Sequence, residues 1–111
     1  MDTSTDYPTL IKQILLAYAE SPATDEDIQA YTLFDDKAGN FALIEAGWQK
    51  DKYLHHTIIH VGYKNGKIWI YCDNTEEGIA TELVEAGVPK ANIVLEFRPV
   101  ELRQYTGFAV A

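Results

Sequence analysis

The stretch YLHHTIIHVGYKNGKIWIYC, residues 53–72, decides the fold of this 111-residue chain. Two segments rich in β-branched and aromatic residues flank the dipeptide Asn65-Gly66, which is the strongest short-range signal for a β-hairpin. Both central residues of a type I′ turn need positive φ, which Asn and Gly tolerate. The sequence therefore predicts antiparallel strands at residues 53–63 and 67–72, joined by a two-residue turn.

A turn of this length fixes which residues of the two strands lie opposite each other. We predict the pairs Lys64–Lys67, Tyr63–Ile68, Gly62–Trp69, Val61–Ile70, His60–Tyr71 and Ile59–Cys72. Because side chains alternate across a strand, one face should carry the core residues Ile59, Val61, Tyr63, Ile68, Ile70 and Cys72. The other face should carry His60, Gly62, Trp69 and Tyr71. We expect the Trp69 ring to lie over the bare backbone of Gly62.

Two further strands and an N-terminal helix precede this hairpin. Apolar residues at helical spacing predict a helix from about Tyr7 to Glu20. Turn residues at 35–40 separate predicted strands at 28–34 and 41–48.

A second helix is expected after the hairpin, from about Thr75 to Ala86. Asn74 is its predicted N-cap, and Glu77 completes a pattern like a capping box. Residues 90–97 fit either a short helix or a strand. We therefore predict a single α+β domain over residues 1–111, with an antiparallel sheet of about four strands and helices on its core face.

Charge argues against direct recognition of nucleic acid. The net charge is −8, and the nine Lys and Arg residues are scattered along the chain. Phosphate backbones are bound by clustered basic residues, so duplex binding is disfavoured. An acidic surface suits solubility or docking on a basic protein partner. The polar, acidic N-terminus lacks the features of a signal peptide, and no apolar run approaches a membrane span, so we expect a cytoplasmic protein.

The sequence offers little that predicts catalysis or metal binding. His55 and His56 point to opposite faces of a strand, and His56 and His60 lie ~13 Å apart, too far for two ligands of one zinc. Asp73, Glu76 and Glu77 fit the start of a helix, and the single cysteine, Cys72, fits a small buried core residue. We therefore predict no catalytic residues, no metal and no cofactor.

Two aromatic regions are candidates for binding a protein partner. The hairpin face with His60, Trp69 and Tyr71 is either covered by another part of the chain or is a binding face, since Trp and Tyr are enriched at interaction hot spots. The terminal stretch YTGFAVA, residues 105–111, is apolar. We predict that Phe108 and Val110 lie on one side of an extended segment near Tyr105, paired with a sheet edge or with a second copy. The alternative is an exposed docking peptide or a signal read by a protease.

Several motifs together resemble one known family. The run from IIHVGYKNGKIWIYC through TEEGIATELVEAGVPK to IVLEF, with the terminal FAVA and the Gly47-Trp48 pair, is similar to XisI-like proteins, the fdxN element excision controlling factors. The chain has YCDN after GKIWI and RPVELRQYTGFAVA near its end, where the family often differs. The resemblance covers nearly the whole chain.

The resemblance implies a non-catalytic accessory protein. XisI-like proteins are associated with excision of a DNA element during heterocyst development in cyanobacteria, next to a separate site-specific recombinase. It also implies an XisH-like protein, of a family that resembles nucleases, as the partner. A small-ligand-binding module, an antitoxin-like regulator of a nuclease-like partner and a homodimer remain as alternatives.

Overall fold

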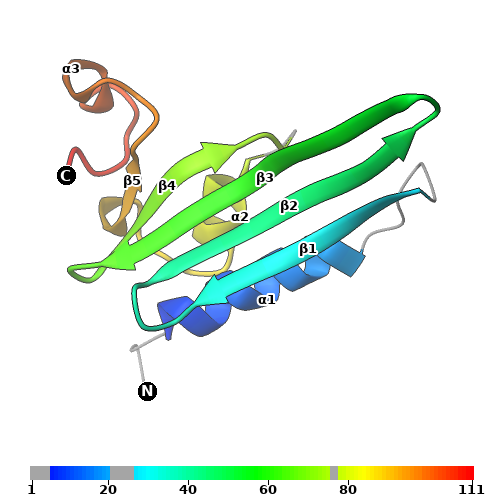
Figure 1. Ribbon diagram of the computed structural model, residues 1–111. Coiled ribbons are helices and arrows are strands. Elements are labelled where there is room, and N and C mark those ends of the chain that lie inside the picture. The colour runs from blue at the N-terminus through cyan, green and yellow to red at the C-terminus, as the bar shows by residue number, and fades with distance from the viewer. Residues whose placement is uncertain (1–5, 21–26, 76–77) are drawn as a thin grey trace.

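The predicted hairpin lies within a five-stranded sheet in the computed structural model, which describes residues 6–20, 27–75 and 78–111 (Figure 1). The spatial order of the strands follows the chain. The strands are β1 (Ile28–Asp35), β2 (Asn40–Gln49), β3 (Lys52–Lys64), β4 (Lys67–Asp73) and β5 (Ile93–Leu95). The first four are antiparallel neighbours, whereas β5 runs parallel to β4.

The two longer helices, α1 (Tyr7–Glu20) and α2 (Ile79–Glu85), pack on the same face of this sheet (Figure 1). Ile11 and Leu15 of α1 are fully buried against the sheet, as are Ile79 and Leu83 of α2. The sheet contributes Phe41, Leu43, Ile59, Val61, Ile68, Ile70 and Ile93 to the same core. In the described part of the chain, no helix has the length and hydropathy to cross a membrane.

The α+β fold class is confirmed, and the sheet gains a strand that the sequence left ambiguous. Residues Lys90–Asn92 form a single 3-10 turn that leads into β5, and the short helix α3 (Val100–Arg103) follows. Ile93 and Val94 are both fully buried, so β5 shows no alternation of apolar and polar residues. A three-residue strand buried on both faces leaves too little pattern in the sequence to be recognised.

The turn of the hairpin is confirmed, and so is the register next to it. Asn65 and Gly66 have φ of 55° and 77°, as a type I′ turn requires. The four pairs nearest the turn are those predicted, from Lys64–Lys67 to Val61–Ile70.

Beyond Val61 the register shifts by one residue, which corrects two predicted pairs. A β-bulge leaves Tyr71 as the extra residue, so His60 pairs with Cys72 and Ile59 pairs with Asp73. Cys72 therefore shares the face of His60 and is half-buried, which corrects its predicted place on the core face.

The bulge also explains why the predicted cap of the second helix is wrong. It turns Asp73 toward the core face, where its Oδ2 accepts a hydrogen bond from the Ile79 amide at 2.7 Å and its Oδ1 accepts one from the Thr75 amide at 3.0 Å. Asn74 instead donates to the Thr57 carbonyl, so it caps no helix. Within the described residues α2 begins only at Ile79, and the predicted Glu77 lies outside the described residues, as does Glu76.

Candidate functional site

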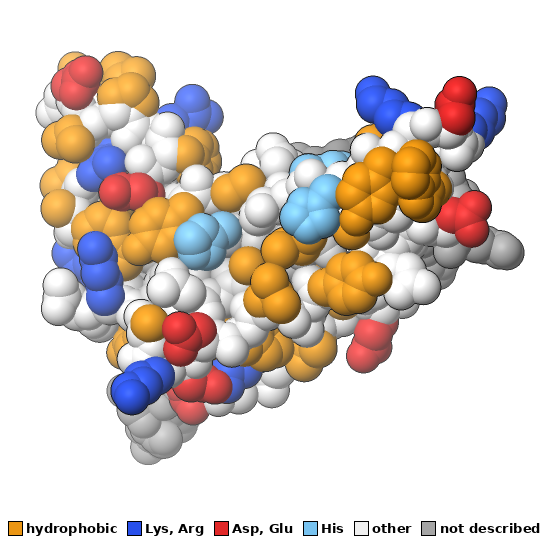
Figure 2. Space-filling model, viewed as in Figure 1, with side chains coloured by type: hydrophobic (Ala, Val, Ile, Leu, Met, Phe, Trp, Pro, Cys, Tyr) orange, Lys and Arg blue, Asp and Glu red, His pale blue; other side chains and the backbone are white. Residues whose placement is uncertain are grey.

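Among the described residues, α1 and α2 both pack on one face of the sheet, and no helix covers the opposite face of β1, β2 and β3 (Figure 1). In Figure 2 hydrophobic and histidine side chains run across this face, while charged side chains gather toward its margins. This face is here called the open sheet face. The strand register places Gln29, Asp35, Asn40, Lys64 and Lys67 toward its ends and the following side chains between them: Tyr31, Leu33, Ala42, Ile44, Ala46, Trp48, Tyr53, His55, Thr57, His60, Trp69, Tyr71 and Cys72.

One half of the open sheet face lies on β1, β2 and the start of β3. Trp48 and Tyr53 are opposite each other, with ring centroids 5.2 Å apart, and both are more than half exposed. Tyr31 and Leu33 on β1 are similarly exposed. Sequence reasoning missed this half, although the alternation of residues 28–34 already separates Tyr31 and Leu33 from the core residue Phe34.

The other half contains the three predicted candidates, His60, Trp69 and Tyr71. The rings of His60 and Tyr71 lie 4.8 Å apart, and His60 Nε2 lies 3.2 Å from Asn40 Oδ1. Tyr71, and not Trp69 as predicted, covers Gly62, because a Cβ there would lie 2.7 Å from Tyr71 Cε2. Tyr71 is also the extra residue of the β-bulge.

Trp69 is held at the turn end of the same face. Its indole Nε1 donates to the Lys64 carbonyl at 3.4 Å, and the Lys64 ammonium lies 4.5 Å from the ring centroid. Trp69 also pairs with Val94 of β5, which is fully buried. The structure thus brings His60, Trp69 and Tyr71 together on one half-buried surface, as the sequence predicted.

The remaining predicted candidates, Tyr105 and Phe108, lie in the C-terminal segment and not on the open sheet face. Phe108 packs against the hydrophobic core, whereas Tyr105 is 79% exposed. The predicted pairing with a sheet edge is confirmed, because Ala109 bridges Val94 and donates its amide to the Ile93 carbonyl at 2.9 Å. Val110 is 49% exposed, so it is not packed against the core as Phe108 is.

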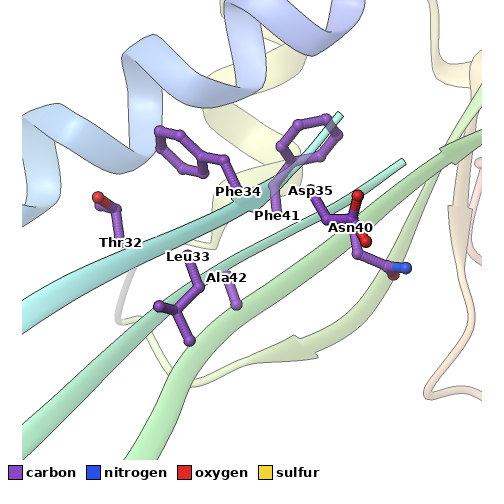
Figure 3. A pocket seen from close by; sticks show the side chains of 7 residues that line it. All are labelled: Thr32, Leu33, Phe34, Asp35, Asn40, Phe41 and Ala42. Carbon is purple, nitrogen blue, oxygen red and sulfur yellow. The ribbon is translucent and has the colours of Figure 1, made fainter. Parts of the chain in front are cut away.

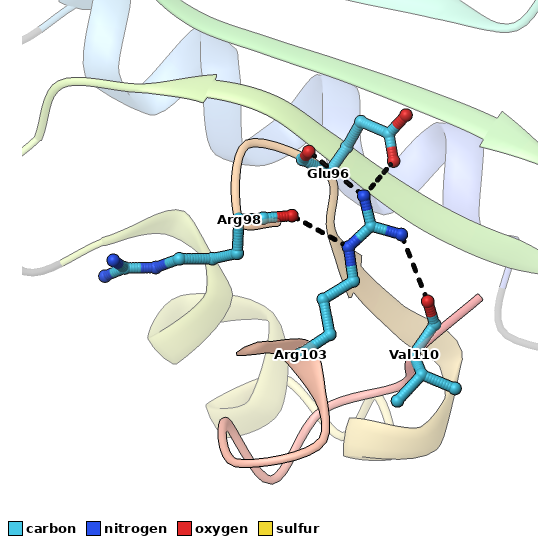
Figure 4. Close-up of polar contacts among 4 residues, drawn as sticks. All are labelled: Glu96, Arg98, Arg103 and Val110. Atoms are coloured by element: carbon cyan, nitrogen blue, oxygen red, sulfur yellow. Dashed lines mark hydrogen bonds and ion pairs between the residues drawn. The ribbon is translucent and has the colours of Figure 1, made fainter. Parts of the chain in front are cut away.

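Arg103 holds this C-terminal segment and was not identified from the sequence (Figure 4). It is the one buried charged side chain among the described residues. Its guanidinium donates to the carbonyls of Glu96, Arg98 and Val110 and to the Glu96 carboxylate, which lies 3.0 Å away. An arginine in a polar helix turn carries no sequence signal for such burial, because its partners are backbone carbonyls.

Among the described residues, no three His, Cys, Asp or Glu side chains cluster as metal ligands would. His56 lies 3.6 Å from Glu45 on the neighbouring strand, on the other side of the sheet from His60. An open pocket follows the β1–β2 hairpin (Figure 3), in which Phe34 and Phe41 point toward α1 while Leu33 and Ala42 point away.

Comparison with known proteins gives the family. The family model described as XisI protein matches residues 1–110. The crystal structure of a XisI-like protein from Anabaena variabilis ATCC 29413 is similar, with 34% identity and a TM-score of 0.88 over 95% of this chain and 96% of that chain.

The crystal structure of the fdxN element excision controlling factor XisI from the same organism is similar as well, with 30% identity and a TM-score of 0.79 over 95% of this chain and 96% of that chain. No curated protein sequence matches significantly. Because the family model spans nearly the whole chain and both structures match its fold end to end, this chain belongs to the XisI family.

Proposed function

We propose that the protein is a non-catalytic regulatory factor in the excision of a DNA element, and that it works by binding other proteins. The observation that carries this proposal is the open sheet face, a broad aromatic and apolar surface on a sheet whose opposite face already holds the core. Large exposed apolar patches mark interaction sites, and Trp and Tyr are the residues most often found at binding hot spots. A relative named as an fdxN element excision controlling factor supports the regulatory role.

The chemistry of the open sheet face indicates the kind of partner. Of the strand residues on this face only Asp35, at the end of β1, carries a carboxylate, although the whole chain carries a net charge of −8. A partner should therefore be apolar over the contact itself and basic around it, since the acidic remainder attracts opposite charge at longer range. We propose an XisH-like protein as this partner, with the site-specific recombinase reached through it. We expect both to act with this chain in the cytoplasm.

Direct contact with DNA is not part of this proposal. The described structure carries no continuous basic stripe, because Lys50 and Lys52 lie at one end of β3 whereas Lys64 and Lys67 lie at the other. Recognition of phosphate needs clustered cations. Catalysis is likewise assigned to the partners in this proposal.

Co-expression with an XisH-like protein tests the proposal, followed by size-exclusion chromatography and a binding titration. Trp48→Ala and Tyr53→Ala remove exposed rings from the open sheet face and should each weaken binding about tenfold or more. Phe97→Ala is the matched control, because Phe97 is an exposed aromatic residue outside that face. Separate elution of the wild-type proteins would reject the XisH-like partner. Equal weakening by all three variants would reject the open sheet face as the docking surface.

A further inference from the structure

The two edges of the sheet differ in whether another segment of the described chain pairs with them. The outer edge of β5 is covered by the C-terminal segment, through the bridge between Val94 and Ala109. At the other edge β1 pairs with β2, and no second strand pairs with β1 within residues 6–20, 27–75 and 78–111. A row of backbone N–H and C=O groups on an edge strand is a ready template for another strand.

The sequence of β1 lacks the features that usually prevent an edge strand from pairing with another chain. It is eight residues long, and the segment Ile28–Phe34 contains no charged residue, no proline and no glycine. Its register with β2 runs through all eight pairs without a bulge. In most proteins a lysine, a proline, a bulge or a very short strand at the edge prevents such pairing. A long, regular and neutral edge is therefore suited to pairing.

We infer that β1 pairs antiparallel with β1 of a second copy of this chain, so that two sheets join into one across a twofold axis perpendicular to the sheet. The neutral strand is where two copies of a chain with net charge −8 approach with the least repulsion. The inference stands independently of the partner proposed above.

Charge also selects the register of this pairing. Opposed residues must share a face, so the twofold axis passes through a residue. Centring on Tyr31 or on Thr32 gives the longest overlap of the two strands. Centring on Tyr31 would set Asp27 against Asp35 at both ends of the strand pair, and like charges directly opposite are destabilising. Centring on Thr32 instead sets Tyr31 against Leu33, which are 48% and 54% exposed in the single chain. These two side chains would cover each other on the open sheet face.

Light scattering coupled to size-exclusion chromatography measures the predicted state. The wild-type protein should elute with twice the 12.5 kDa mass of one chain. Leu33→Lys should shift it to the mass of one chain, because it places a charge on the edge. Leu102→Lys is the matched control, as Leu102 is similarly exposed, 49% against 54% for Leu33, but lies on α3, and it should leave the mass unchanged.

A cysteine pair tests the register directly in a Cys72→Ser background. Thr32→Cys should form an intermolecular disulfide on oxidation, because directly opposed strand residues lie within bonding range. Gln29→Cys should not, since the two copies would lie ~20 Å apart along the strand. A wild-type protein that stays monomeric at high concentration would overturn the inference. So would a dimer that is insensitive to Leu33→Lys and is cross-linked equally from both positions.

Discussion

Replacing Arg103 with methionine tests whether the C-terminal segment is held on the sheet by the buried guanidinium. Arginine is 8% exposed here and makes four hydrogen bonds, at 3.0 to 3.3 Å. Methionine keeps much of the apolar stem but can donate none of these bonds. The variant should therefore separate hydrogen bonding from simple packing.

The expected loss of stability is about 2–4 kcal/mol. A hydrogen bond to a charged group contributes about 1.5–3 kcal/mol, and breaking a buried ion pair costs about 3–5 kcal/mol. The four bonds do not add, because Glu96, Arg98 and Val110 are exposed residues whose oxygens can regain water once the guanidinium is gone. The Glu96 side chain is 39% exposed, which reduces the cost further.

Urea denaturation followed by tryptophan fluorescence is a suitable assay, because Trp69 pairs with β5 next to the segment. Arg103→Lys should recover less than half of the loss, since an ammonium keeps the charge but cannot reproduce the planar fork. Hydrogen exchange should show faster loss of the Ala109 amide proton, which is bonded to the Ile93 carbonyl.

Arg98→Met is the matched control, because that guanidinium is exposed and lies 5.4 Å from the Phe97 ring centroid. Its effect should stay within about 0.5 kcal/mol, as for other surface substitutions. Equal stabilities of Arg103→Met and Arg98→Met would refute the reasoning. The segment would then be held by Phe108 and the Ala109 bridge alone.

Three further predictions concern the hairpin and the helix contacts. Gly66→Ala should cost about 1 kcal/mol in urea denaturation through its φ of +77° alone, since a Cβ there meets open space, and an unchanged midpoint would mean that the turn relaxes freely. Ile70→Ala, at a fully buried position, should cost about 2–5 kcal/mol, and a loss under 1 kcal/mol would contradict its place in the core. Burial, with a hydrogen bond to Glu82, raises the pKa of Tyr18 to about 12 from 10.0, so stability should be complete below pH 10 and fall as pH rises toward 12. Tyr18→Phe should remove that alkaline loss, and a wild-type slope in the variant would assign it to another group.

The hairpin shows which parts of the fold the sequence could predict. Asn65-Gly66 is enough to predict the type of turn, and the type of turn determines which residues pair next to it. Next to the bulge at Tyr71, Asp73 accepts a hydrogen bond from the Ile79 amide at the start of α2, six residues away along the chain. The sequence of the strand contains no pattern that indicates such a contact with another element. The predicted pairs were therefore wrong beyond Val61, where the register depends on tertiary structure.

The candidate site also contains a part that the sequence could predict and a part that it could not. His60, Trp69 and Tyr71 could be placed together because they surround one turn. The larger aromatic half, with Trp48 and Tyr53, needed the pairing of β2 with β3, which the sequence predicted only as separate strands. Arg103 could not be found at all, because its burial is created by carbonyls of a segment that folds back on itself.

The position of the two interaction surfaces has a consequence for assembly. A face-to-face dimer would bury the open sheet face and compete with a partner for it. Pairing through β1 avoids that competition, because a twofold axis perpendicular to the sheet leaves both open sheet faces pointing the same way. A partner with two equivalent sites would then gain affinity from binding both at once. The co-expressed complex should therefore contain two copies of this chain, and a complex with a single copy would reject pairing through β1 while leaving the docking surface intact.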